Sequence, residues 1–211
     1  GRSELVRAIY GADKPDGGEL YVKGEKLDVK APIDAMHKGM AYCPEDRKVE
    51  GIIADLSVRE NMILALQAKR GMFKLMSRKE QEELTDKYIK MLQVKTASRE
   101  TPIKSLSGGN QQKAIIAREV EQDSSLMIFV QPTRGLDIGA IENIHKQIIA
   151  ERDKGKAILL ISLELDEIMN CADTIAVIYN GSIQKIAKAS ELTTNEVGEF
   201  MMGVKNKEKE A

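Results

Sequence analysis

The pattern of hydrophobic and polar positions divides the chain into three zones. The first zone, residues 1–55, has short apolar runs separated by polar turns, as in residues 19–22 after the turn-rich segment 14–18. Gly and Pro beside short runs of Leu, Tyr and Val are typical of short strands joined by turns. This zone therefore predicts a small flank of β-structure.

The second zone, from about residue 58 to 104, has the pattern of charged helices. Ser57 is followed by Glu60, and Ser77 is followed by Glu80. This is the spacing of a capping box, in which a serine and a glutamate satisfy the free N–H groups at the start of a helix. We therefore expect one helix to begin after each serine.

The third zone alternates between strand and helix. Residues 126–130 and 157–161 are unbroken apolar runs, as expected of parallel strands that are covered on both faces. Between them, residues 141–153 predict a crossover helix that stops near Gly155. Such an alternation is typical of an α/β domain with a parallel sheet.

The remaining part of the third zone predicts a hairpin and a last helix. Residues 174–186 read as two strands around the turn Asn180-Gly181, a dipeptide that favours tight hairpin turns. Thr193 and Glu196 have capping-box spacing, which predicts a helix after them.

These zones predict a single α/β domain over residues 1–211. Its parallel sheet core carries an antiparallel β flank, a helical subdomain is inserted at about residues 58–104, and a charged tail follows at about residues 205–211. Architecture of this kind says little about function by itself.

The segment 106–113, Leu-Ser-Gly-Gly-Asn-Gln-Gln-Lys, is the strongest functional signal. Ser107 can cap a helix that begins around Asn110. Gly108 and Gly109 lack Cβ atoms, so their backbone amides can approach a phosphate without obstruction. Together with the positive end of the helix dipole, these amides form an anion site. The alternative interpretation is an ordinary glycine-containing loop before an ordinary helix.

Several segments resemble motifs of the ABC ATPase family. Residues 106–113 are similar to the signature motif, in the form that sugar-importer cassettes have. Residues 41–48 are similar to the Q-loop segment, with Glu45 where most ABC proteins have glutamine. Residues 131–137 match the stretch from the end of Walker B into the D-loop, and residues 162–166 fall on the H-loop. The resemblance covers essentially the whole chain and implies a P-loop NTPase-type core.

The resemblance also implies how the chain is used. In ABC proteins two cassettes dimerise head to tail, and each signature closes on the ATP held by the P-loop of the other. The opening Gly1-Arg2-Ser3-Glu4-Leu5 resembles the weakened P-loop of second cassettes, so we expect the chain to begin inside that loop. ATP and Mg²⁺ are the implied cofactors, mainly through the partner cassette. The implied nucleotide-binding residues are Gly1, Arg2, Ser3, Ser107, Gly108, Gly109, Asn110, Gln111 and Asp137.

The catalytic positions implied by the resemblance are all altered. Val130 replaces the Mg²⁺-associated aspartate, and valine has no oxygen to offer a hard cation. Gln131 replaces the water-polarising glutamate and cannot act as a general base. Leu163 stands where the switch histidine would be, and Arg2 stands where the P-loop lysine would be. We therefore expect no intact catalytic residue, no metal site and no ATPase activity in this chain alone.

The sequence thus predicts a degenerate second cassette of an importer for simple sugars or nucleosides, and it leaves those two substrate classes open. The helical insert and the Glu45 loop are expected to face membrane-spanning permease subunits, and an extracytoplasmic substrate-binding protein is an indirect partner. The expected location is peripheral, on the cytoplasmic face of the plasma (inner) membrane, with the isolated chain soluble.

Composition adds mainly exclusions. The net charge is −1, the pI is about 6.3, and 31% of residues are charged with both signs interleaved, so no strong field attracts nucleic acid. No apolar run approaches the ~20 residues of a membrane span. Cys43 and Cys171 lack metal or redox spacing. Arg47 and Lys48 can contact phosphate, but surface ion pairs are the simpler interpretation.

Rival functions from other classes make predictions that the sequence does not meet. A duplicated cassette acting on ribosomes predicts a long basic linker and intact Walker B acids, and a chromosome-maintenance cassette predicts long coiled-coil heptads. A stand-alone nucleotide sensor needs a complete P-loop. A nucleotide-dependent regulatory module and a non-functional remnant remain as alternatives.

Overall fold

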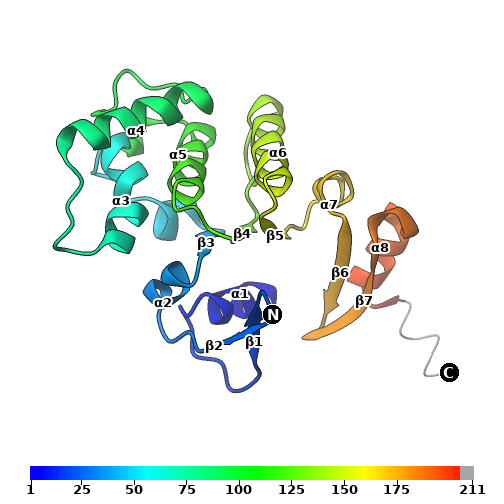
Figure 1. Cartoon of the computed structure of the whole chain (residues 1–211). Coiled ribbons are helices and arrows are strands. Elements are labelled where there is room, and N and C mark those ends of the chain that lie inside the picture. The colour runs from blue at the N-terminus through cyan, green and yellow to red at the C-terminus, as the bar shows by residue number, and fades with distance from the viewer. Residues whose placement is uncertain (205–211) are drawn as a thin grey trace.

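The computed structural model describes residues 1–204 of the chain, and the charged tail expected at about residues 205–211 lies outside them. The elements run in chain order from α1 at the N-terminus to α8 near the end of the described residues (Figure 1). The longer helices are α1 (Arg2–Ile9), α2 (Pro32–His37), α3 (Val58–Arg70), α4 (Arg78–Met91), α5 (Gly108–Val120), α6 (Ile138–Asp153), α7 (Leu165–Cys171) and α8 (Thr194–Met201). Three short helices are the π-helix η1 (Arg47–Gly51) and the 3₁₀ turns η2 (Ile103–Ser105) and η3 (Ala189–Glu191).

The strands form three sheets in the described part of the chain. They are β1 (Leu20–Val22), β2 (Glu25–Leu27), β3 (Met40–Cys43), β4 (Leu126–Val130), β5 (Ala157–Ile161), β6 (Thr174–Tyr179) and β7 (Ser182–Lys188). The central sheet is parallel in the order β3-β4-β5, while β1 pairs with β2 and β6 pairs with β7, both antiparallel. This arrangement confirms the predicted α/β fold with a parallel sheet and antiparallel strands.

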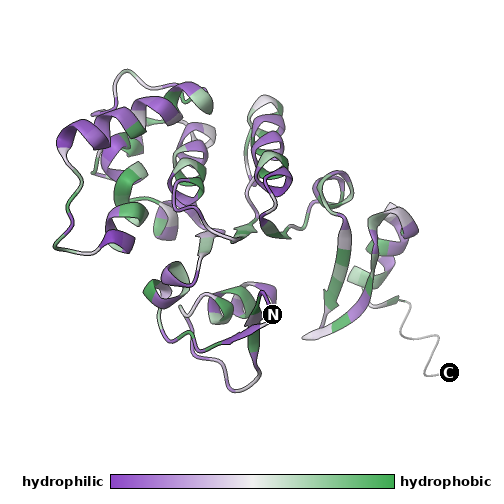
Figure 2. Cartoon of the chain, in the orientation of Figure 1, coloured by the Kyte–Doolittle hydropathy of each residue, from purple (hydrophilic) through white to green (hydrophobic). Residues whose placement is uncertain are grey.

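The central strand β4 is covered on both faces. Met127 and Phe129 point into the cluster under α5 and α6, whereas Ile128 and Val130 pack with Val6 of α1 on the opposite face. Figure 1 shows the helices α3 to α6 on one side of this sheet and α1 on the other, and Figure 2 shows β4 and β5 as mainly hydrophobic. The unbroken apolar run of β4 therefore has the burial that the sequence predicts for it.

The neighbouring strand β5 is less buried than predicted. Its residues are exposed or half-buried, although it pairs with β4 along its whole length, up to Val130 opposite Ile161. The cause is an open cleft of about 560 Å³ between β5 and β6, which is also lined by residues of α1, α6, α7 and α8. The prediction that residues 157–161 are covered on both faces is confirmed only in part: Ile158 and Leu160 pack on one cluster and Leu159 and Ile161 on the opposite one, but only partly. Within residues 1–204, the edge of β5 away from β4 has no neighbouring strand.

The local signals for helices and the hairpin are confirmed. Ser57, Ser77 and Thr193 each accept a hydrogen bond from the N3 backbone N–H of the following helix, as the capping pattern predicts. In the hairpin β6–β7, Asn180 and Gly181 have φ angles of 46° and 76°, which are the left-handed values that a tight hairpin turn requires.

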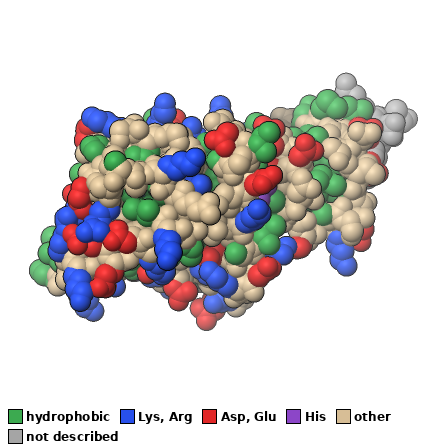
Figure 3. Space-filling view, turned by 90° about the horizontal axis from the view of Figure 1, so that it is seen from above, with side chains coloured by type: hydrophobic (Ala, Val, Ile, Leu, Met, Phe, Trp, Pro, Cys, Tyr) green, Lys and Arg blue, Asp and Glu red, His purple; other side chains and the backbone are tan. Residues whose placement is uncertain are grey.

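The surface matches the interleaved charges of the sequence. Figure 3 shows acidic and basic side chains mixed over one face rather than gathered by sign. Of the described residues, none belongs to a helix that is long and apolar enough to cross a membrane. No group of three or more potential metal ligands occurs within residues 1–204 either.

Candidate nucleotide-binding site

The loop before α5 is fixed by two side-chain amides of that helix. Gln111 is buried, and its Nε2 donates to the carbonyl oxygens of Ile103 and Leu106 over 3.2 and 3.1 Å. Asn110 donates to the Ser107 hydroxyl over 2.9 Å and accepts from the backbone N–H of Lys95 over 2.8 Å. These two residues therefore hold the loop in place from inside.

Ser107 occupies the N-cap of α5, but its hydroxyl does not cap the helix. The helix begins at Gly108, two residues earlier than the expected start near Asn110, and no backbone N–H donates to the Ser107 side chain. Instead the hydroxyl accepts from Asn110. Its own proton stays available, as do backbone N–H groups in the first turn of α5, which helices leave unpaired. An exposed Ser107 beside a helix N-terminus can therefore donate to an anion.

Both glycines have close neighbours within the chain. A Cβ atom on Gly108 would lie 2.6 Å from Nη2 of Arg47, and a Cβ atom on Gly109 would lie 3.0 Å from Cβ of Ala140. The sequence predicts that both glycines let a phosphate approach the backbone. The structure adds a second reason, because Arg47 and α6 come close to the start of α5.

Asp137 acts locally at the N-terminus of α6. Its side chain accepts a hydrogen bond from the backbone N–H of Ala140 over 2.9 Å, so it is a regular N-cap. Asp137 is exposed, and Ala140, to which it is bonded, is the residue that Gly109 approaches. The start of α6 thereby lies beside the start of α5.

The three positions at which the resemblance implies lost catalytic groups lie at the ends of β4 and β5. Val130 is fully buried and pairs with Ile161. Gln131 is buried with φ of 51°, and its Oε1 accepts from the backbone N–H of Leu163 over 3.3 Å. Leu163 is half exposed and brings only hydrocarbon. Neither a metal-binding carboxylate nor a base stands at this edge of the sheet at positions 130, 131 and 163.

The residues that the resemblance assigns to a P-loop lie at the start of α1. Gly1 is exposed and precedes the helix, and Arg2 lines the cleft between β5 and β6. Ser3 donates its hydroxyl to Oε2 of Glu45 over 2.9 Å. Ser3 and Glu45 belong to separate motifs in the sequence, and the fold brings them into direct contact.

Glu45 connects further to residues that the sequence argument did not select. Its Oε1 accepts from Nη1 of Arg134 over 3.0 Å, and the carbonyl oxygen of Arg134 accepts from Nη1 of Arg47 over 3.0 Å. Arg47 in turn covers Gly108. A chain of contacts thus runs from Ser3 through Glu45, Arg134 and Arg47 to the start of α5. The glutamate at position 45 was the only signal for it, since a carboxylate there needs cationic or hydroxyl partners.

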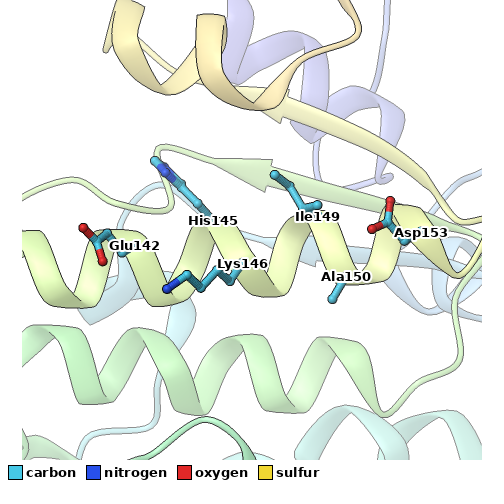
Figure 4. Close-up of a pocket in the computed structure, with 6 residues that line it drawn as sticks. All are labelled: Glu142, His145, Lys146, Ile149, Ala150 and Asp153. Carbon is cyan, nitrogen blue, oxygen red and sulfur yellow. The ribbon is translucent and has the colours of Figure 1, made fainter.

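A shallow hollow of about 350 Å³ lies elsewhere, along α6. Figure 4 shows its six residues, Glu142, His145, Lys146, Ile149, Ala150 and Asp153, all on that one helix. His145 shares a hydrogen bond of 2.9 Å with the buried carboxylate of Glu167, which also accepts from the Thr133 hydroxyl over 2.9 Å. The polar groups of this hollow do not converge on one point, so it is not the candidate site.

Comparison with known proteins places these observations in a family. The family model described as ABC transporter matches residues 1–134. The chain is 45% identical over 178 residues to the fructose import ATP-binding protein FruK of Bifidobacterium longum, covering 84% of this chain and 35% of that protein. It is 40% identical over 210 residues to the guanosine import ATP-binding protein NupO of Bacillus subtilis, covering 99% and 41%. The chain therefore spans less than half the length of these curated relatives.

Solved structures support the same fold. A dimeric post-hydrolysis state of the ATP-binding cassette MJ0796 bound to ADP and Pi has a TM-score of 0.77 at 23% identity, covering 90% of this chain and 81% of that one. A nucleotide-free ATP-binding cassette from an ABC transporter has a TM-score of 0.78 at 23% identity, covering 94% and 80%. At this identity the likeness concerns the fold alone.

Proposed function

Because the chain belongs to the ABC transporter family of ATP-binding proteins, we propose that it is a catalytically degenerate second cassette of an importer for simple sugars or nucleosides. Its role is to supply the loop at residues 106–111 in trans to ATP bound by a catalytic partner cassette. ATP and Mg²⁺ are then held mainly by the partner, and residues 1–3 form the weakened P-loop of this cassette.

The contrast between two parts of the site carries this proposal. At the start of α5, the Ser107 hydroxyl is exposed and free to donate, and Gln111 and Asn110 fix the loop. At the ends of β4 and β5, Val130 is sealed in the core and Gln131 is tied to Leu163. Groups used on a partner's nucleotide are therefore preserved, while groups used on the chain's own nucleotide are not.

An exposed apolar loop supports the proposed membrane partners. Met72, Phe73 and Leu75 lie between α3 and α4 and are 80%, 98% and 74% exposed. Contiguous apolar side chains in solvent typically mark an interaction surface. We assign this loop to contact with the permease subunits, through which the extracytoplasmic substrate-binding protein is an indirect partner. The chain would then lie peripherally on the cytoplasmic face of the membrane.

The names of the relatives support both substrate classes. Curated relatives include fructose, arabinose, guanosine and nucleoside import ATP-binding proteins at 40–45% identity. Both classes therefore remain in the proposal. A transport assay with radiolabelled ribose, fructose and guanosine separates them.

The proposed trans role is tested in the complete importer that contains this chain, reconstituted in liposomes. Ser107→Arg or Gly108→Asp should lower substrate-stimulated ATP hydrolysis about 10²–10³-fold, the usual effect of losing one preorganised donor to developing charge. Gln131→Ala is the matched control and should leave hydrolysis nearly unchanged. If the two signature variants hydrolyse like wild type while Gln131→Ala is inactive, hydrolysis depends on the site at the ends of β4 and β5 rather than on the loop before α5. The proposal then fails.

A further inference from the structure

The guanidinium of Arg47 covers one face of Gly108. A Cβ atom built on Gly108 would lie 2.6 Å from Nη2, 3.1 Å from Cζ and 3.3 Å from Nε of Arg47. All three atoms belong to the planar charged group rather than to the aliphatic stem. A positive charge therefore lies directly against the first residue of α5.

This charge has no carboxylate partner in the described part of the chain. Nη1 of Arg47 donates to the carbonyl oxygen of Arg134, while Nε is buried and has no hydrogen-bond partner among residues 1–204. The neighbouring Glu45 is engaged by Arg134, and Asp46 accepts two backbone N–H groups of η1. The expectation that Arg47 forms a surface ion pair is therefore wrong.

The position of Arg47 is fixed by packing of η1 on α5. Arg118 of α5 donates to the carbonyl oxygen of Gly51 at the end of η1 over 2.7 Å. Gly51 also lies so close to Ile115 that a Cβ atom there would come 2.7 Å from Cδ1. Because η1 is anchored on the helix whose first residue Arg47 covers, the backbone of Arg47 is held beside the loop, and its bond to the Arg134 carbonyl directs the guanidinium there.

Two features of this arrangement are unfavourable in the absence of a ligand. The positive end of the α5 dipole disfavours a neighbouring cation, and a buried N–H without an acceptor loses its hydration without compensation. A phosphate placed between the guanidinium and the first turn of α5 would relieve both at once. The planar fork of arginine also matches phosphate oxygens better than lysine does.

We propose that Arg47 is a phosphate-binding residue of the signature loop, and this inference rests on the proposed function. Its guanidinium contacts the terminal phosphate of the nucleoside triphosphate that the partner cassette presents, together with the Ser107 hydroxyl and the first amides of α5. Its bond to the Arg134 carbonyl holds the side chain at the loop until the phosphate arrives.

The test measures ATP hydrolysis against ATP concentration in the reconstituted importer. Arg47→Met keeps the aliphatic stem and removes the charge, so kcat/KM for ATP should fall on the order of 10- to 100-fold, the effect of one charged hydrogen bond. Arg47→Lys restores the charge without the fork and should recover part of this loss. Lys48→Ala, the adjacent exposed basic residue, should stay within about twofold of wild type.

The outcomes separate this inference from the proposed function. Wild-type kinetics in Arg47→Met would mean that Arg47 only fills space above Gly108, and a larger loss in Arg47→Lys than in Arg47→Met would mean that a positive charge there does not assist the phosphate. Either result overturns the inference. Ser107→Arg in the same assay reports on the signature loop itself. If Ser107→Arg is inactive and Arg47→Met is normal, the proposed function stands and only the role of Arg47 is lost.

Discussion

The backbone N–H of Leu163 donates to Oε1 of Gln131 over 3.3 Å. This bond ties the residue after β4 to the loop after β5. Both residues stand at positions where the family resemblance implies a water-polarising acid and a switch histidine. Neither an amide nor a leucine side chain can take up a proton near neutral pH, so the paired positions are joined structurally without retaining proton-transfer chemistry.

We therefore expect residues 1–211 alone to hydrolyse no ATP, and the double variant Val130→Asp/Gln131→Glu not to restore activity. Val130 is fully buried against Val6 and Ile128, so an aspartate there would be a buried, unpaired charge that destabilises the fold by several kcal/mol, on the order of 3–5. Phosphate release from the purified chain and urea unfolding of the double variant check both statements. Steady turnover that depends on a residue of this chain would contradict the first.

The glycines at the start of α5 should respond differently to alanine. Gly109→Ala places Cβ 3.0 Å from Ala140 of the packed helix α6, and overpacking of this kind costs about 1–3 kcal/mol. Gly108→Ala meets only the end of the Arg47 side chain, which can swing away, so its free energy of unfolding should change by less than about 1 kcal/mol. Denaturant titration of both variants measures the difference. Equal destabilisation would show that Arg47 cannot move.

The cleft between β5 and β6 predicts association of the isolated chain. It measures about 560 Å³, and an apolar strand edge without a partner is a site for edge-to-edge pairing. Purified residues 1–211 should aggregate at micromolar concentration, followed by light scattering. Ala157→Lys charges the edge of β5 and should slow this aggregation, whereas Ala97→Lys, at an exposed loop position, should not. Equal rates in the two variants would place the aggregating surface elsewhere.

The sequence was informative wherever a short local motif decides the structure. Capping boxes at Ser57 and Thr193 and the Asn180-Gly181 turn depend on neighbouring residues only, and each is found as predicted. The burial of residues 157–161 was predicted only in part because it depends on what lies beside β5, which is not encoded within the run. Apolar residues there have the same pattern whether a neighbouring strand is present or not.

In the candidate site too, features decided by neighbouring residues were predicted from the sequence, whereas contacts between distant residues were not. Residues 107–111 were selected from glycines and amides that are adjacent in sequence. The contacts of Glu45 with Ser3 and of Arg47 with Gly108 join positions 42 and 61 residues apart, and no spacing rule reaches that far. Arg47 was assigned to the surface because arginine is usually exposed and paired. Its position against Gly108 depends on the packing of η1 on α5.

Stability should depend on pH through Glu151 at the end of α6. Burial raises the pKa of this carboxyl, but ion pairs with Lys154 and Lys156, at 2.6 and 2.7 Å, outweigh it and lower the pKa below its ordinary value of 4.5. A folded pKa below the unfolded value adds stability above about pH 4.5, and this stability is lost as pH falls through the folded pKa. Glu151→Gln should cost about 1–3 kcal/mol at pH 7.

The measurement is urea unfolding of wild type and Glu151→Gln between pH 3 and 7. The difference in free energy of unfolding should be largest at pH 7 and shrink as the pH falls below about 4.5. Glu142→Gln on the exposed side of α6 is the matched control and should leave the profile unchanged. A difference that is constant over the whole range would show that Glu151 contributes by packing rather than by charge.

The loop between α3 and α4 should bind membrane subunits without contributing to the fold. Phe73 is 98% exposed and Met72 is 80% exposed, so Phe73→Ser and Met72→Ser should leave the melting temperature unchanged. Burying one such side chain in an interface is worth about 1.5–3 kcal/mol, so each variant should weaken association with solubilised permease subunits by about tenfold or more. Ile186→Ser, which removes an exposed apolar side chain from β7, is the control. If Phe73→Ser binds as tightly as Ile186→Ser, this loop is not part of the interface, because both changes remove an exposed apolar side chain and differ mainly in where it lies.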